Sequence, residues 1–186
     1  MELASFSPVI REILAENRLS PLGPGTPNEP MRARLERLTA ESLFAPQQVA
    51  DPDFARCCLA GLWLYHDFLD QAHEISQEIE TTSGSYWHGI MHRREPDYSN
   101  AAYWFRRVGK HPVFDSLPAA ARELAPDMAI PSPWSPFWFI DYCEACANRK
   151  EPGEQFARQM QKREWELLFE YCCRHAVREN VPRGGK

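Results

Sequence analysis

Prolines and glycines divide this chain into separate segments, and this punctuation constrains its fold more than any other feature. Four prolines and two glycines fall within residues 20–30, and further stops come at Pro46, Pro96 and Pro112. Between the stops, apolar residues recur every three or four positions, the spacing that lines one face of an α-helix. No run of alternating apolar residues stands out between turn signals. The sequence therefore predicts an all-α fold.

A chain of 186 residues fits one domain. We expect a single compact helical domain of about seven helices, with a long helix of about seven turns that starts at Asp51–Pro52. The helical segments are expected at about 4–19, 30–43, 54–80, 85–94, 98–108, 116–125, 137–150 and 154–179. Residues 1–50 would hold the N-terminal helices and a Pro/Gly-rich loop, residues 51–114 the helices that carry a site, and residues 134–180 a C-terminal helical hairpin.

The charge and the apolar runs exclude several classes of protein. The net charge of −5 argues against a general nucleic-acid binder, which needs a basic surface to neutralise phosphates. The N-terminus has no uninterrupted apolar signal-peptide core, and no run reaches the length of a membrane-spanning helix. The six cysteines all fall in segments predicted to be helical. We expect a reducing cytoplasm, with the cysteines serving mostly as small buried hydrophobic residues.

Charge is unevenly distributed along the chain. Residues 51–80 hold seven acids and one base, a sum of −6, while residues 92–111 hold five bases and two acids, a sum of +3. Two neighbouring helical segments of opposite sign are expected to face one another or to share a site. The alternative is that each segment faces solvent.

The segment 86–114, YWHGIMHRREPDYSNAAYWFRRVGKHPVF, has the composition of a polar site. Its 29 residues include three histidines, five Arg or Lys, two acids, an Asn and two tryptophans. A purely structural helix would combine an apolar stripe with a uniform solvated face. The sequence therefore predicts that this segment lines a polar pocket.

Histidines in this region have metal-ligand spacing. His88 and His92 are four apart, which places both imidazoles on one helix face, and Glu95 follows three residues later. His73 belongs to a polar stripe on the preceding helix, so two facing stripes would form a site for a divalent metal between helices. The alternative is a pair of hydrogen-bonded core histidines. No other cofactor is indicated.

Arginines and aromatic rings in the same segment suit an anionic or polyhydroxylated ligand. Guanidinium groups offer forked donors to carboxylate or phosphate, and aromatic rings commonly wall small-molecule pockets. The alternative is that the arginines form internal ion pairs with nearby acids. The candidate ligand-binding residues are Arg93, Arg94, Asn100, Tyr103, Trp104, Arg106, Arg107 and His111.

Acid–base catalysis is a further hypothesis for this site. His88, His92 or His111 would act as a general base near neutral pH, oriented by Glu95 or Asp97. An arginine would stabilise developing negative charge. The chain contains no Gly-rich phosphate loop, no G-x-S-x-G elbow and no H-E-x-x-H zinc signature.

The segment 85–114, and YWHGIMHRREPDYSNAAYWFRRVG within it, resembles the core of an uncharacterised family of small cytosolic proteins. The resemblance implies no reaction, only that the histidines, arginines and acids named above distinguish the family. A second likeness is to a single tetratricopeptide or Sel1 hairpin, because Gly89, Ala101, Phe105 and Pro112 fall near the small, small, aromatic and proline positions of that motif. Only one copy is visible, whereas stacked repeats need about three.

Three hypotheses for function follow. The preferred one is a pocket that binds a small anionic or polyhydroxylated molecule, with His88 and His92 available for acid–base work. The second is a helical-hairpin module whose arginines and aromatic residues contact a partner protein. The third is a metal-dependent hydrolase that uses His88, His92 and a carboxylate.

Overall fold

The computed structural model describes residues 2–149 and 153–177, and it confirms the all-α prediction. Ten α-helices lie within these residues, compared with about seven expected. They follow a short 3-10 turn at Leu3–Ser5 and are α1 (Pro8–Ile13), α2 (Glu29–Leu35), α3 (Ala40–Phe44), α4 (Pro52–Tyr65), α5 (Leu69–Ser76), α6 (Thr82–Arg94), α7 (Tyr98–Val108), α8 (Val113–Leu124), α9 (Pro136–Arg149) and α10 (Glu154–Ala176).

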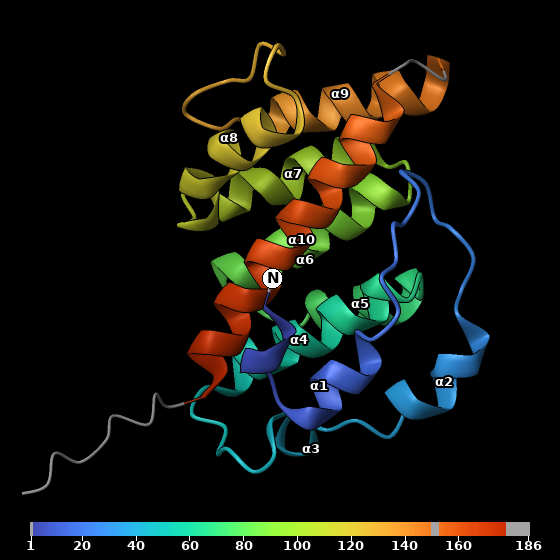
Figure 1. Ribbon diagram of the computed structural model, residues 1–186, viewed down its shortest axis with the longest axis vertical. Helices are drawn as coiled ribbons and strands as arrows, with labels where there is room; N and C mark the ends of the chain where they lie inside the picture. The colour runs from blue at the N-terminus through green and yellow to red at the C-terminus, as the bar shows by residue number, and fades with distance from the viewer. Residues whose placement is uncertain (1, 150–152, 178–186) are drawn as a thin grey trace, which may run out of the picture.

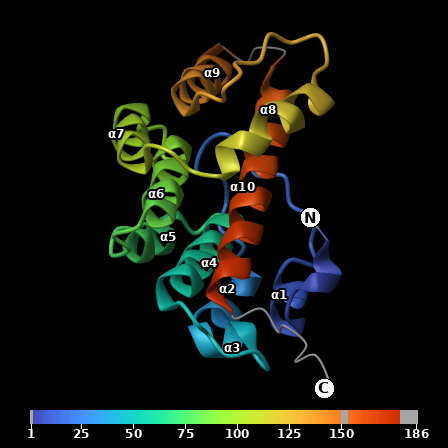
Figure 2. The ribbon, with the colours of Figure 1, turned by 90° about the vertical axis from the view of Figure 1, so that its left-hand side faces the viewer.

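The long helix α10 forms the spine of the molecule (Figure 1). Helices α4, α8 and α9 pack against it. Helices α5, α6 and α7 stack in succession on one side of α10, and α1 lies on the other side (Figure 2). The stack brings α6, which carries residues 86–94, against α5, the helix that carries His73.

Side-chain caps start the helices that carry the candidate site. The Asp51 carboxylate accepts hydrogen bonds from the backbone N–H groups of Asp53 and Phe54, as its position before Pro52 predicts. Thr81 caps α6, and Asp97 caps α7 by accepting from the Asn100 N–H. These caps satisfy N–H groups that the first turn of a helix leaves without a partner.

The prediction of one long helix over residues 54–80 is wrong, because the helix is interrupted between α4 and α5. Asp67 lies in the break with φ of +64°, a left-handed conformation that Asp tolerates better than most residues. Its carboxylate accepts hydrogen bonds from Arg18 at 2.8 Å and from Arg94 at 2.7 Å. Both arginines come from distant segments, so the apolar spacing of the helix does not reveal the break.

Other boundaries also differ from the predictions. The segment predicted as one helix over 4–19 contains only the 3-10 turn and α1. The helix predicted over 154–179 ends at Ala176, and residues 178–180 of the predicted C-terminal hairpin lie outside the described residues. Within residues 2–149 and 153–177, no helix combines the length and apolar character needed to cross a membrane.

The helices α4, α6 and α10 approach closely at Gly61. The indole N–H of Trp165 on α10 donates to the Gly61 carbonyl oxygen at 2.9 Å. A Cβ atom at position 61 would lie 2.9 Å from the Trp87 ring on α6 and 3.2 Å from the Phe169 ring on α10. Both rings are fully buried, so neither has free space to move into. The absence of a side chain at this position lets the three helices meet.

We expect Gly61→Ala to lower the free energy of unfolding by about 1–3 kcal/mol, because it overpacks this contact. The loss is expected even though Ala favours the helix by about 1 kcal/mol over Gly. Urea denaturation followed by circular dichroism measures the change. Gly23→Ala is the control, since a Cβ there meets no atom within 4 Å. Equal stability of the two variants would contradict the close approach.

Candidate metal centre

Three histidines from α5 and α6 converge on one point. His73 lies on α5, while His88 and His92 lie one turn apart on α6. Each imidazole offers one nitrogen, and the three nitrogens lie within 4.8 Å of one another. The Nε2 atoms of His88 and His92 are 2.8 Å apart. The sequence-predicted set for a metal is therefore brought together.

The cluster lies at the edge of the core. His88 and His92 are 1% and 5% exposed, whereas His73 is only partly buried. The Trp104 ring on α7 stacks on the His88 ring with a centroid separation of 4.0 Å. The Asn100 amide nitrogen lies 3.1 Å from His92 Nε2. Helix α7 therefore covers the histidines of α6, and the cluster reaches solvent on the side of His73.

The outer nitrogens of the two buried imidazoles have polar partners. His92 Nδ1 lies 3.0 Å from the Glu95 carboxylate, and His88 Nδ1 lies 3.3 Å from the Ser76 hydroxyl oxygen. These contacts orient both rings so that their Nε2 atoms point toward each other. Metal-binding histidines in proteins are commonly held in this way, by a carboxylate or hydroxyl on the nitrogen that faces away from the ion.

Two proton arrangements are compatible with these contacts. An ionised carboxylate only accepts, so His92 Nδ1 donates to Glu95 and leaves a lone pair on its Nε2. In one arrangement His88 Nε2 donates to that lone pair, and the Ser76 hydroxyl donates to His88 Nδ1. In the other, His88 Nδ1 donates to Ser76, and two Nε2 lone pairs face each other. In the second arrangement the Asn100 amide donates to the His92 Nε2 lone pair, and a cation between the two Nε2 atoms would replace that hydrogen bond.

Burial keeps both imidazoles neutral at physiological pH. Burial, with the proximity of His92 and His73, lowers the pKa of His88 to about 3. Burial also lowers the pKa of His92. A neutral imidazole is the form that binds a metal ion. The imidazoles can therefore bind a metal ion without first having to release a proton.

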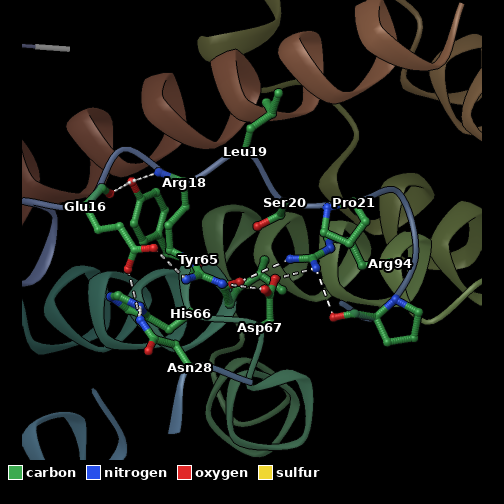
Figure 3. Close-up of polar contacts among 12 residues, drawn as sticks. Glu16, Arg18, Leu19, Ser20, Pro21, Asn28, Tyr65, His66, Asp67 and Arg94 are labelled. Carbon is green, nitrogen blue, oxygen red and sulfur yellow. Dashed lines mark hydrogen bonds and ion pairs between the residues drawn. The ribbon is translucent and has the colours of Figure 1, made fainter. Parts of the chain in front are cut away.

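Arg94 is committed to an internal network rather than to the cluster. It donates to the Asp67 carboxylate, to the Leu64 carbonyl and to the carbonyls of Gly23 and Pro24 (Figure 3). Arg18 donates to the other oxygen of the same carboxylate. Figure 3 shows both guanidinium groups directed at Asp67 from the N-terminal segment and from α6. This network holds the Pro/Gly-rich loop against the core.

Arg93 is committed to a different partner. Its Nη2 donates to Glu164 on α10 at 2.5 Å, and both side chains are 0% exposed. The Tyr86 hydroxyl donates to the other Glu164 oxygen at 3.0 Å. The guanidinium lies over the Phe139 ring at 4.6 Å, and its Nε and Nη1 have no hydrogen-bond partner among the described residues. The adjacent arginines thus join α6 to opposite parts of the molecule.

The second pair of arginines lies on the surface of α7. Arg106 and Arg107 are both exposed. The Arg107 guanidinium lies 5.1 Å from the Trp104 ring centroid, and its Nη1 is 3.5 Å from the hydroxyl of Tyr103, which is 49% exposed. The four arginines therefore do not converge. Of the four, Arg107 is linked to the histidine cluster, because it lies over Trp104, and Trp104 stacks on His88.

His111 and Asp97 have other roles. The His111 ring lies between Ser83, whose hydroxyl is 3.0 Å from Nε2, and the backbone N–H of Val113, which donates to Nδ1. Burial lowers the pKa of His111 to about 4. Asp97 is exposed and caps α7. Neither side chain forms a hydrogen bond with the imidazole of His73, His88 or His92. Neither therefore belongs to the candidate site.

Several residues of these networks were not among the sequence-predicted candidates. They are Ser76, Tyr86, Asp67 and Glu164. The sequence contains a signal for Glu164, because this acidic residue interrupts the apolar stripe of α10 between Met160 and Leu168. A carboxylate on a buried stripe needs a buried cationic partner. The sequence contains no such signal for Ser76, since a serine three residues after a histidine is common.

Comparison of the chain with protein-family models, with curated proteins and with solved structures gave no match. The assignment of a function therefore depends on the geometry of the candidate site.

We expect Glu164→Ala to lower the free energy of unfolding by about 3–5 kcal/mol, because it leaves the Arg93 guanidinium buried without a counter-ion. Denaturant unfolding measures the loss. The control is Glu12→Ala, which removes a surface ion pair with Arg34. That change is expected to cost less than about 1 kcal/mol. A similar small cost for both variants would show that Arg93 does not depend on this carboxylate.

Proposed function

We propose that the protein is a metal-dependent hydrolase that holds a divalent transition-metal ion, of the zinc class, through His73, His88 and His92. The observation that carries the proposal is the convergence of three imidazoles within 4.8 Å, two of them oriented by Ser76 and Glu95. In tetrahedral zinc sites the Zn–N distance of about 2.0–2.1 Å separates two ligand nitrogens by about 3.3 Å. The Nε2 atoms of His88 and His92 are 2.8 Å apart, and all three nitrogens lie within 4.8 Å of one another.

Three protein ligands suit a catalytic ion better than a structural one. Structural zinc sites usually use four protein ligands, whereas catalytic sites keep a fourth position for water or substrate. The partly exposed His73 places that position on the solvent side of the cluster. A bound zinc ion would supply a water molecule with a pKa near 7 as the nucleophile. Hydrolysis is therefore the reaction class that this ligand set supports.

Glu95 and Ser76 act as positioning residues in this proposal. Glu95 accepts from His92 Nδ1, so it raises the basicity of the ring and leaves Nε2 without a proton. An ion bound there would replace the hydrogen bond that the Asn100 amide donates to Nε2. Ser76 plays the same part for His88 by accepting from Nδ1. The Ser76 hydroxyl also lies 3.3 Å from the His73 carbonyl, to which it donates. One hydroxyl thus links the two helices that supply the ligands.

The surface next to the cluster supports a small anionic substrate. Trp104 stacks on His88, and Arg107 lies over Trp104 with its guanidinium exposed. An exposed guanidinium is a fork of donors for carboxylate or phosphate. The buried Arg93 and Arg94 are bound to Glu164 and Asp67 and do not share this role. Arg107, rather than the buried arginines, is therefore the proposed donor to an anionic ligand.

We expect metal-free protein to bind one equivalent of Zn²⁺ or Co²⁺. Cobalt reports the site directly, because tetrahedral Co²⁺ bound to nitrogen ligands absorbs visible light. His73→Ala should abolish or strongly weaken binding, and it is the decisive variant because His73 is partly exposed and its loss leaves the core intact. His175→Ala, at an exposed histidine on α10, should bind like the wild type. Titration without saturation at one equivalent would remove the proposal.

We expect the zinc-loaded protein to hydrolyse an activated anionic ester such as p-nitrophenyl phosphate, and to lose this activity when a chelator removes the ion. Arg107→Gln should raise KM for the anionic ester by about tenfold, the loss of one charge-assisted hydrogen bond, and leave KM for neutral p-nitrophenyl acetate unchanged. Arg106→Gln is the control. Metal binding without chelator-sensitive turnover of either ester would leave a metal-binding protein and refute the hydrolase.

A further inference from the structure

Two cysteines from distant parts of the chain are in contact between α4 and α10. The Sγ atoms of Cys58 and Cys173 are 3.5 Å apart, and the residues are 115 positions apart in sequence. At this distance one thiol donates a weak hydrogen bond to the other. The adjacent residues Cys57 and Cys172 form a second thiol contact between the same helices. The two helices thus face each other through paired thiols, although neighbouring cysteines within each helix do not pair.

The two pairs differ in their access to solvent. Cys173 lies on the wall of an open groove of about 370 Å³ and is 6% exposed. The groove is also lined by Phe6, Ile10 and Phe44, on the side of α10 where α1 lies. Cys58, Cys57 and Cys172 are 0% exposed. A small molecule that enters the groove therefore reaches one thiol of the Cys58–Cys173 pair and neither thiol of the other pair.

We propose that Cys58 and Cys173 form an oxidant-sensitive thiol pair, which a small hydroperoxide entering the groove converts into a disulfide that joins α4 to α10. The Sγ atoms need to approach by about 1.5 Å to reach the disulfide bond length of about 2.05 Å. Rotation about side-chain torsions at two already touching thiols can supply most of that distance.

The chemistry is a two-step, two-electron oxidation. The Cys173 thiolate attacks one oxygen of hydrogen peroxide, the O–O bond breaks, and hydroxide leaves, which gives a sulfenic acid on Cys173. Cys58 then attacks that sulfur, the S–O bond breaks, and the departing hydroxide takes the Cys58 proton to form water. Overall, two thiols and one peroxide give one disulfide and two waters.

Access from the groove supports this order of attack. Burial raises the pKa of both thiols. The hydrogen bond between them raises the pKa of Cys58 further and acts in the opposite direction on Cys173. Cys173 is the thiol on the groove, so it meets the peroxide first and is the nucleophile, while the fully buried Cys58 attacks second. Because the thiolate reacts, the rate of closure should rise with pH.

The test uses the reduced full-length protein treated with a few equivalents of hydrogen peroxide. We expect the intact mass to fall by about 2 Da, the loss of two hydrogens in one disulfide, and peptide mapping to link Cys58 to Cys173. Dithiothreitol should restore the original mass. A link between Cys172 and Cys173, a link involving Cys143 or Cys146, or an unchanged mass under conditions that oxidise a free thiol peptide would overturn the proposal.

Variants assign the two roles. In Cys58→Ser the oxidation should stop at sulfenic acid on Cys173, which dimedone traps. In Cys173→Ser neither the link nor the trapped product should form at Cys58, since that thiol does not face the groove. Cys172→Ala is the matched control on α10 and should still form the Cys58–Cys173 disulfide. Equal trapping at Cys58 and Cys173 would contradict the assigned order.

Discussion

The need to satisfy polar groups on one buried helix organises this fold. Helix α6 is buried at every residue from Ser83 to Arg94, although its last turns carry two imidazoles and two guanidinium groups. A buried charge or polar group without a partner costs several kcal/mol. Each of these side chains is therefore tied to a different element. Arg93 binds α10, Arg94 binds the turn after α4 and the N-terminal loop, and the histidines bind groups on α5, on α7 and after α6.

The arginine networks explain why a dense polar segment need not be a ligand pocket. Glu164 and Asp67 already accept from Arg93 and Arg94, and both carboxylates are nearly inaccessible to solvent. An incoming anion would have to displace these carboxylates inside a low-dielectric region, where an isolated carboxylate is strongly disfavoured. Among the four arginines of segment 86–114, those exposed to solvent are Arg106 and Arg107 on α7. Burial, rather than residue type, separates the structural arginines from the available ones.

Local features of the fold were predictable from the sequence because their causes are local. The Asp51 cap and the bounds of α7 follow from residues within a few positions of each other, and the structure has them where the sequence indicates. The pairing of His88 with His92 is similar, because it needs only helical spacing. The break at Asp67 depends on Arg18 and Arg94, which lie 49 and 27 positions away. Contacts between residues so far apart cannot be recognised from the local pattern of a single sequence, so the break was not predicted.

The candidate site was predictable only in part for the same reason. The approach of His73 was open to prediction as a facing stripe, but the stripe was placed on a helix that the structure divides in two. That division lets α5 lie beside α6, and it brings His73 to the two histidines. The partner of Arg93 lies 71 positions away on α10. Spacing along one helix identifies which groups share a face, but the opposing helix decides whether they meet a ligand or a counter-ion.

The histidine cluster and the thiol pair lie in different parts of the molecule, so their chemistries are separable. The histidines lie in the stack of α5, α6 and α7 on one side of α10, whereas Cys173 borders a groove on the side of α1 (Figure 2). Imidazole ligands favour zinc-class ions, and a buried pair of thiols with raised pKa values competes poorly for the same ion near neutral pH. The shortest stretch of chain between the sites is α4, which carries Cys58 and leads through Asp67 into α5, the helix of His73. Because Arg18 and Arg94 hold that turn, a disulfide at Cys58 would restrain α4 without moving His73 away from its partners.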